Sequence, residues 1–152
     1  MNSVSSPLSP SRFAVLGYGG LLPFIGLTLL VLFYAQYRSL WSAMLVSYGA
    51  VILSFIGALH WGFAMALQGM LAEHRRARLV WSVIPALVGW VSTLVAVPLG
   101  CLMLTAGFIV HLWQDQKLAQ ALPRWYLPMR GYLTLVVSLC LLLSAFAVLF
   151  EF

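Results

Sequence analysis

The stretch Leu79–Trp113, LVWSVIPALVGWVSTLVAVPLGCLMLTAGFIVHLW, decides the fold because almost no polar residue interrupts it. As one helix rising 1.5 Å per residue it would be roughly 50 Å long, too long for a single crossing of a hydrocarbon core about 30 Å thick. Its segment VPLG, Val97–Gly100, places a proline and a glycine near the middle. These residues favour a tight turn, so we predict two helices, 79–97 and 99–114, with a re-entrant hairpin as the alternative.

The whole chain has the composition of a membrane protein. Of its 152 residues, 63% are hydrophobic and 7% are charged, whereas soluble domains carry about 25% charged residues. Three more apolar runs are long enough to cross a bilayer, at residues 13–35, 43–67 and 129–150. The sequence therefore predicts an all-α integral membrane protein: a five-transmembrane-helix bundle formed by one domain, 13–152, after a short disordered tail, 1–12.

The positive charges give this bundle a direction. Seven of the eight Lys and Arg residues fall on the side shared by the N-terminal tail and the loops near 68–78 and 115–128, and only Arg38 falls on the other. Cytoplasmic loops are enriched in Lys and Arg, so we predict a cytoplasmic N-terminus and a periplasmic C-terminus. The first run lacks a good signal cleavage site, and the tail is too weakly basic for a transit peptide. We therefore expect a bacterial membrane protein in contact with the lipid bilayer, and no nucleic acid partner, because the cations form no single stripe.

Ionisable residues inside the predicted spans are the candidate functional residues. His60 and His111 would lie about 12 Å and 8 Å from the cytoplasmic face. Asp115 follows His111 by four residues and so shares its helical face, and Arg130 enters the last span from the same side. These four residues are therefore a candidate polar cluster that the geometry allows, although the sequence does not show whether the two histidines meet.

An unpaired charge inside a membrane costs several kcal/mol, so such residues are functional candidates by default. A neutral imidazole costs much less. For His60 three roles stay open: a hydrogen bond between helices, proton transfer or ligand binding, and haem or metal ligation.

The second span carries a small residue at every fourth position. Such a stripe lets another helix approach closely, which is how helices associate in lipid; a substrate path is the alternative. The stripe consists of Ala50, Ser54, Ala58, Gly62 and Ala66.

The two cysteines, Cys101 and Cys140, lie in apolar runs without CxxC spacing and are predicted to be packing residues.

Two loops on the predicted cytoplasmic side stand out. The segment AEHRRARL, Ala72–Leu79, is interpreted first as a positive-inside signal that sets the orientation of the chain. The second interpretation is contact with anionic lipid through Arg75, Arg76 and Arg78. LPRWYLPMR, Leu122–Arg130, is either a stiff loop that fixes the entry of the last helix or a docking surface for another membrane protein. The candidate docking residues are Pro123, Arg124, Trp125, Tyr126 and Arg130.

Three segments carry a resemblance to a known family: YGAVILSFIGALHWG (Tyr48–Gly62), WSVIPALVGW (Trp81–Trp90) and LPRWYLPMRGYLT (Leu122–Thr134). With Pro23 they resemble the bacterial membrane family labelled "domain of unknown function 3429", which has a mitochondrial relative, transmembrane protein 69. The resemblance covers nearly the whole chain. It implies a small polytopic inner-membrane protein but supplies no activity. The residues that it places at recurring family positions are His60, Trp61, Asp115, Trp125, Tyr126 and Arg130.

No catalytic motif is present: the sequence has no HExxH, GxSxG, P-loop or dinucleotide fingerprint and only three carboxylate side chains. We therefore lean away from an enzyme and expect no cofactor. The leading hypothesis is a non-catalytic scaffold, assembly factor or accessory subunit of a larger membrane complex. The alternatives are a proton or small-solute transporter or channel, acting as a homo-oligomer through His60, His111 and Asp115, and a redox protein that binds haem b or a quinone.

Overall fold

The computed structural model describes residues 10–66, 69, 71–118 and 123–150, without the side chains of 10–14, so residues 1–9 of the predicted tail lie outside it. The elements of the described part are all helical, which confirms the all-α class. They are α1 (Pro10–Gly19), α2 (Leu21–Phe33), the 3-10 helix η1 (Ala35–Tyr37), α3 (Arg38–Ala66), α4 (Ala72–Ser92), α5 (Val97–Gln116) and α6 (Tyr126–Leu149).

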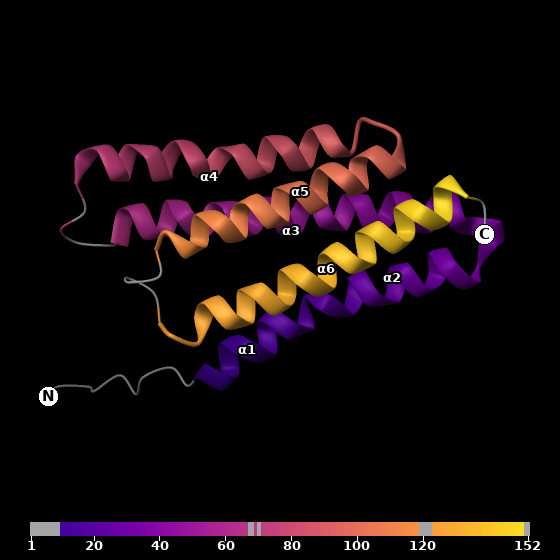
Figure 1. Cartoon of the computed structure of the whole chain (residues 1–152), viewed down its shortest axis with the longest axis horizontal. Helices are drawn as coiled ribbons and strands as arrows, with labels where there is room; N and C mark the ends of the chain where they lie inside the picture. Colours follow the sequence, from indigo (N-terminus) through magenta and orange to yellow (C-terminus); the bar gives the residue numbers. More distant parts are fainter. Residues whose placement is uncertain (1–9, 67–68, 70, 119–122, 151–152) are drawn as a thin grey trace, which may run out of the picture.

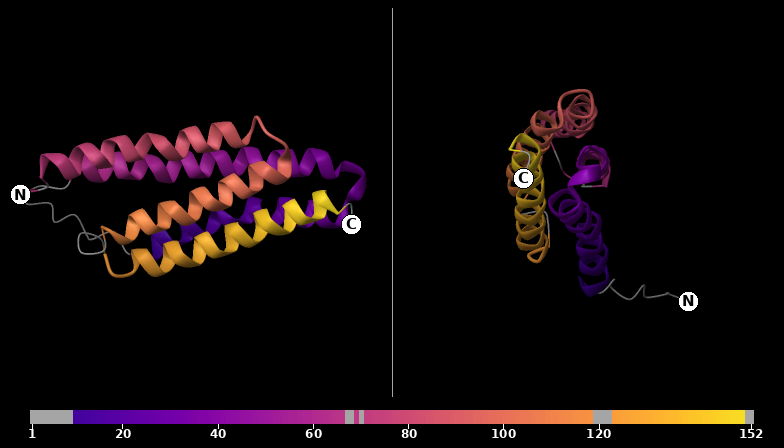
Figure 2. Two further views of the ribbon diagram at one scale, coloured as in Figure 1. Left: turned by 45° about the horizontal axis from the view of Figure 1, so that its top comes forward. Right: turned by 90° about the vertical axis from the view of Figure 1, so that its right-hand side faces the viewer.

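The long helices lie side by side and run alternately up and down an elongated bundle (Figure 1). Neighbouring helices α2–α3, α3–α4, α4–α5 and α5–α6 are in contact, and α2 also contacts α6, so the ring of helices is closed (Figure 2). Helix α3 contacts α5 and α6 across this ring. Leu45, Leu104 and Leu141 are fully buried between the helices. Large apolar side chains such as Leu22 also cover the outside, as expected for a surface in lipid.

Four segments of the described chain are long and apolar enough to cross a membrane: Val15–Phe33, Ala35–Ala66, Val97–Gln116 and Tyr126–Leu149. Helix α4 has 21 residues, but its first turns hold one acidic and three arginine side chains, so it is not among them. It nevertheless runs along α3 for most of the length of the bundle (Figure 1). The structure agrees with a membrane protein, while the number of crossings and their direction remain predictions.

The connection between α4 and α5 lies earlier than the sequence predicts. Helix α4 ends at Ser92, residues 93–96 form the connection, and Val97–Gly100 is the first turn of α5. Pro98 fits this turn because its missing N–H would have no acceptor inside the helix. Gly100 serves a contact rather than a turn, since a Cβ there would collide with the backbone oxygen of Ser92.

The first predicted span is formed by two helices. Gly20 separates α1 from α2. Pro23 accounts for the break, because it has no N–H for the carbonyl of Gly19 and its ring crowds that carbonyl. The Tyr48 hydroxyl donates a hydrogen bond of 3.0 Å to the carbonyl oxygen of Gly20, so α3 supports the chain at the interruption.

Helices α3 and α4 approach each other through glycines. A Cβ on Gly89 of α4 would lie 2.9 Å from the backbone oxygen of Ala50, and a Cβ on Gly57 of α3 would lie 2.9 Å from Cβ of Pro85. Neither position has room for a methyl group without a shift of the neighbouring helix. We call these two contacts the α3–α4 seam.

The predicted small-residue stripe coincides with this seam only in part. Ala50 is buried and Ser54 is half-buried, whereas the other three positions are exposed, so the stripe does not pack within this chain over its full length. The reason is geometric: with 3.6 residues per turn, a four-residue spacing drifts by about 40° at each step and leaves the contact face. The exposed positions are Ala58, Gly62 and Ala66.

The two cysteines are buried and free of disulfides. Both Cys101 and Cys140 belong to the hydrophobic core, which confirms the prediction that they are packing residues.

Candidate functional site

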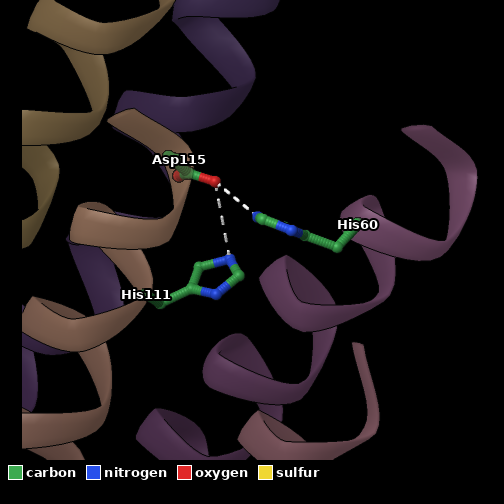
Figure 3. Close-up of side chains that lie close together, drawn as sticks. All are labelled: His60, His111 and Asp115. Carbon is green, nitrogen blue, oxygen red and sulfur yellow. Dashed lines mark hydrogen bonds and ion pairs between the residues drawn. The ribbon is translucent and has the colours of Figure 1, made fainter. Parts of the chain in front are cut away.

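A buried carboxylate lies near the end of the bundle where α3 and α5 end and α4 and α6 begin (Figures 1 and 3). Asp115 exposes no surface. Its Oδ1 is 2.8 Å from Nε2 of His60, and its Oδ2 accepts a hydrogen bond of 3.1 Å from Nε of Arg130. One aspartate of α5 therefore connects α3 to α6.

The second histidine lies directly beside the first. The ring centroids of His60 and His111 are 4.7 Å apart, and Nε2 of His111 is 3.9 Å from Oδ1 of Asp115. Figure 3 shows the two imidazoles converging on the same carboxylate from α3 and α5. The structure thus brings together all four residues of the predicted cluster, His60, His111, Asp115 and Arg130.

Two residues of α4 complete the arrangement. The indole Nε1 of Trp81 donates a hydrogen bond of 3.2 Å to Nδ1 of His111, and the two rings are stacked at 9°. The guanidinium of Arg78 lies 3.4 Å from Nδ1 of His60 and donates a hydrogen bond of 3.2 Å to the backbone oxygen of Gln114. We call His60, Arg78, Trp81, His111, Asp115 and Arg130 the polar network; it joins α3, α4, α5 and α6.

The donors from α4 fix the position of the proton on each imidazole. An indole N–H can only donate, so Nδ1 of His111 must accept and its proton must be on Nε2. That Nε2 donates to the backbone oxygen of Ile56 at 3.0 Å. A guanidinium likewise only donates, which leaves the proton of His60 on Nε2, directed at Asp115. All four ring nitrogens then have partners.

This proton arrangement matters for metal binding. His60, His111 and Asp115 each offer one ligand atom, all within 4.8 Å of one another. A histidine that binds a metal through Nε2 normally donates its Nδ1 proton to an acceptor. Here both Nδ1 atoms face donors, Trp81 and Arg78, which is the opposite arrangement. The hydrogen bonds of the network therefore suit protonated Nε2 atoms and not a metal ion.

The sequence predicts Arg75, Arg76 and Arg78 as a single set of lipid contacts, and the structure divides that set. Arg78 points into the polar network, while Arg75 is half-buried and Arg76 exposed. Sequence reasoning missed Arg78 and Trp81 as members of the network. The available signal was their spacing of three residues, which puts both side chains on one face of α4.

The candidate docking residues are divided in the same way. Pro123 and Arg124 are exposed and Trp125 is half-buried, whereas Leu122 lies outside the described residues. Tyr126 and Arg130 belong to α6 and face inward: Arg130 contacts Asp115, and the ring of Tyr126 lies 6.3 Å from that of Phe63. Of the candidate docking residues, Pro123 and Arg124 are therefore the ones exposed at the surface of the described chain.

Two hollows adjoin the polar network from different sides. A groove of about 680 Å³ between α4 and α5 is lined by Arg78, Trp81 and Gln114, among others. A cavity of about 170 Å³ on the side of α2, α3 and α6 is lined by Arg130 and otherwise mostly by apolar residues. Groups of the network thus lie in the walls of both.

Comparison with known proteins places the chain in a family. Residues 9–146 match the family model described as "Protein of unknown function (DUF3429)". The curated "Transmembrane protein 69" of Xenopus tropicalis is 32% identical over 130 residues, which cover 84% of this chain and 51% of that protein. Its counterpart in Mus musculus is 28% identical over 130 residues, which cover 84% of this chain and 53% of that protein.

The chain spans about half the length of these curated relatives. No solved structure gives a significant match. The family model covers most of the chain, so the resemblance seen in the sequence is confirmed: this chain belongs to the family of proteins of unknown function DUF3429.

Proposed function

We propose that this protein is a non-catalytic partner within a membrane: a scaffold, an assembly factor or an accessory subunit of a larger membrane complex. One observation carries the proposal. Each nitrogen of His60 and His111 is engaged by a group of another helix or by Asp115, so these histidines hold helices together. Because described residues engage every ring nitrogen, neither imidazole has a free lone pair with which to bind a substrate.

The charges of the network support the same role. Asp115 and Arg130 are both buried, with side chains 0% and 7% exposed. Removing one member of a buried ion pair is strongly destabilising, because the other charge is left without a partner. A network of this kind favours one arrangement of four helices over its alternatives, as a scaffold requires.

The proposed location is the bacterial inner membrane, crossed five times, with the N-terminus in the cytoplasm. Helix α4 lies against α3 and α5, which supports its role as the fifth crossing. Its charged first turns are at the end of the bundle that the positive-inside rule assigns to the cytoplasm. The relatives named transmembrane proteins support a membrane home.

The test is purification in a mild detergent at natural abundance, followed by mass measurement of the intact assembly. We expect a complex with another membrane protein in fixed stoichiometry. Arg124→Glu changes an exposed residue of the docking segment 123–125 and should weaken that complex, whereas Arg76→Glu makes the same charge change at an exposed position of α4 as a matched control. A protein that elutes alone or only with copies of itself contradicts the proposal.

A second candidate function, proton transfer as part of transport by an oligomer, is favoured by the position of the network. Arg78, His60, Asp115 and Arg130 form a continuous chain of contacts from the groove to the cavity. Proteoliposomes would then show a proton flux that His60→Gln abolishes and that His74→Gln, at an exposed position, leaves unchanged. Equal flux in empty vesicles would remove this candidate.

The redox alternative is less well supported. With ring centroids of His60 and His111 only 4.7 Å apart, no flat macrocycle fits between the two rings as it would in a bis-histidine haem site. A colourless purified protein that gains no haem spectrum when haem is added is the expected result.

A further inference from the structure

The cavity beside the polar network has the shape and chemistry of a ligand site. Its volume is about 170 Å³, and Leu21, Phe24, Ile52 and Val137 contribute apolar walls. Apolar cavities of about 150 Å³ are known to bind a molecule as large as benzene. The space is therefore sufficient for a small head group and the first carbons of a chain.

One wall of this cavity carries polar groups that lack partners. Tyr126, Arg130 and Thr134 line it from successive turns of α6, since they are spaced four residues apart. The Tyr126 hydroxyl, Nη2 of Arg130 and the Thr134 hydroxyl are buried and have no partner with good hydrogen-bond geometry in the described part of the chain, and the Tyr126 hydroxyl lies beside the Arg130 guanidinium. Buried donors without acceptors are costly, and a charged donor most of all. The three together would satisfy one head group that accepts several hydrogen bonds.

The charge of the neighbouring network points to an anion. The network contains two guanidinium groups, Arg78 and Arg130, and one carboxylate, Asp115. Nε of Arg130 already binds Asp115, whereas its Nη2 on the cavity wall has no hydrogen-bond acceptor. An oxyanion at this point would balance the charge and accept the unpaired donors.

The rim of the cavity points to a molecule with a tail. Leu16 of α1 and Phe55 of α3 line the cavity and are 76% and 63% exposed, so the cavity reaches the outer apolar surface of the bundle. In a membrane this surface faces lipid chains. A hydrocarbon tail longer than the cavity would leave past these two side chains.

We propose that this cavity binds one lipid with an oxyanion head, a carboxylate or a phosphate, held by Arg130, Tyr126 and Thr134, with its acyl chain leaving between Leu16 and Phe55. This site goes beyond the proposed scaffold function and does not depend on it. A lipid held here would contact α1, α3 and α6 together and complete the hydrogen bonds of Arg130.

The test is thermal unfolding of the full chain in a nonionic detergent with three 12-carbon probes: dodecanoate, the single-chain lysophosphatidate and dodecanol. We expect dodecanoate or the lysophosphatidate to raise the melting temperature in a saturable way, and dodecanol, which has the same tail without charge, to have no effect. Which of the two anions binds more tightly distinguishes a fatty acid from a phospholipid as the natural source. Equal effects of dodecanol and the anions, or no effect of any probe, would overturn the proposal.

Two variants test the site without removing its charge. Tyr126→Phe and Thr134→Val retain the shape of each side chain, and each should weaken anion binding about fivefold to tenfold, the loss of one hydrogen bond. Tyr132→Phe, at an exposed position of the same helix, is the matched control and should bind like the wild type. Unchanged binding in both site variants would overturn the proposal, as would binding of a short-chain quinone without binding of either anion.

Discussion

Helix α3 is held by its neighbours in two different ways along its length. Near its C-terminal end, His60 is joined to Asp115 by a hydrogen bond of 2.8 Å inside a network of charged groups. Further toward its N-terminal end, Ala50 and Gly57 contact α4 through close van der Waals packing at the seam. The first region depends on hydrogen bonds between a few polar groups. The second depends on glycines, whose lack of a side chain lets the two helices come close.

The bilayer explains why both kinds of contact are present. Lipid chains are as apolar as leucine, so packing two helices together gains little unless their backbones come close, as they do at the seam. Charges in lipid are costly unless they are paired, so a polar contact there is directional and fixes which side chains meet. The seam thus brings α4 close, and the polar network fixes its position. Each can be broken by a different change.

The largest effect should follow from loss of the central charge. Asp115→Asn leaves the guanidinium groups of Arg78 and Arg130 without a counter-charge, and we expect a loss of about 3–5 kcal/mol in the free energy of unfolding. Unfolding by sodium dodecyl sulfate from a mild detergent measures it. Glu73→Gln, the same chemical change at an exposed position, is the control.

A second variant keeps this prediction specific to charge. Combining Asp115→Asn with Arg130→Gln removes both partners of the ion pair, so part of the lost stability should return. If Asp115→Asn is as stable as Glu73→Gln, the network does not hold the bundle together.

The next largest effect should come from a methyl group at the seam. Gly89→Ala places a Cβ 2.9 Å from the backbone oxygen of Ala50, so α3 and α4 must move apart. We expect a loss of about 1–3 kcal/mol, as for other overpacked contacts. Gly62→Ala is the matched control, because it makes the same change in α3 at a position with no neighbour within 4 Å. Equal stability of the two variants would show that the seam can open without cost.

The two regions also differ in how far the sequence predicts them. Ionisable residues are so rare in these spans that His60, His111, Asp115 and Arg130 stand out as candidates, and their depth and spacing allow a common cluster. That the two histidines meet at Asp115 could not be predicted and is seen only in the structure. The donors from α4 could not be predicted, because they depend on how far α4 is rotated about its own axis. That rotation depends on the contacts of α4 with α3 and α5, which the sequence does not show.

The seam itself leaves little trace in the sequence. A helix in lipid is apolar on all sides, so hydrophobic periodicity does not show which face is buried. The small residues of α3 therefore predict a stripe along the whole helix, whereas in the structure this stripe leaves the contact face after Ser54. Pro98 and Gly100 are ambiguous in a similar way. A proline in the first turn of a helix, followed by a glycine at a close contact, gives the same sequence pattern as a turn.

A smaller effect tests whether α4 determines the proton position of His111. Trp81→Phe keeps an aromatic ring but removes the donor to Nδ1, and we expect a loss of about 1 kcal/mol. In ¹⁵N spectra of labelled histidine, the wild type should show His111 protonated on Nε2, and the variant a mixture of both tautomers. Trp90→Phe, at an exposed position of the same helix, should change neither. A wild-type His111 protonated on Nδ1 would contradict the assigned network.

The smallest effect on stability is expected at the exposed part of the stripe. A substitution there distinguishes packing within the chain from packing between this chain and a partner. Ala58→Leu adds a large side chain on the outer face of α3, so the free energy of unfolding of the isolated protein should change by less than about 0.5 kcal/mol. Ala106→Leu on the exposed face of α5 is the control. If a partner packs against the stripe, Ala58→Leu will reduce the mass of the native complex while Ala106→Leu will not. If neither variant changes that mass, the seam is where the small residues of α3 act, and the partner binds elsewhere.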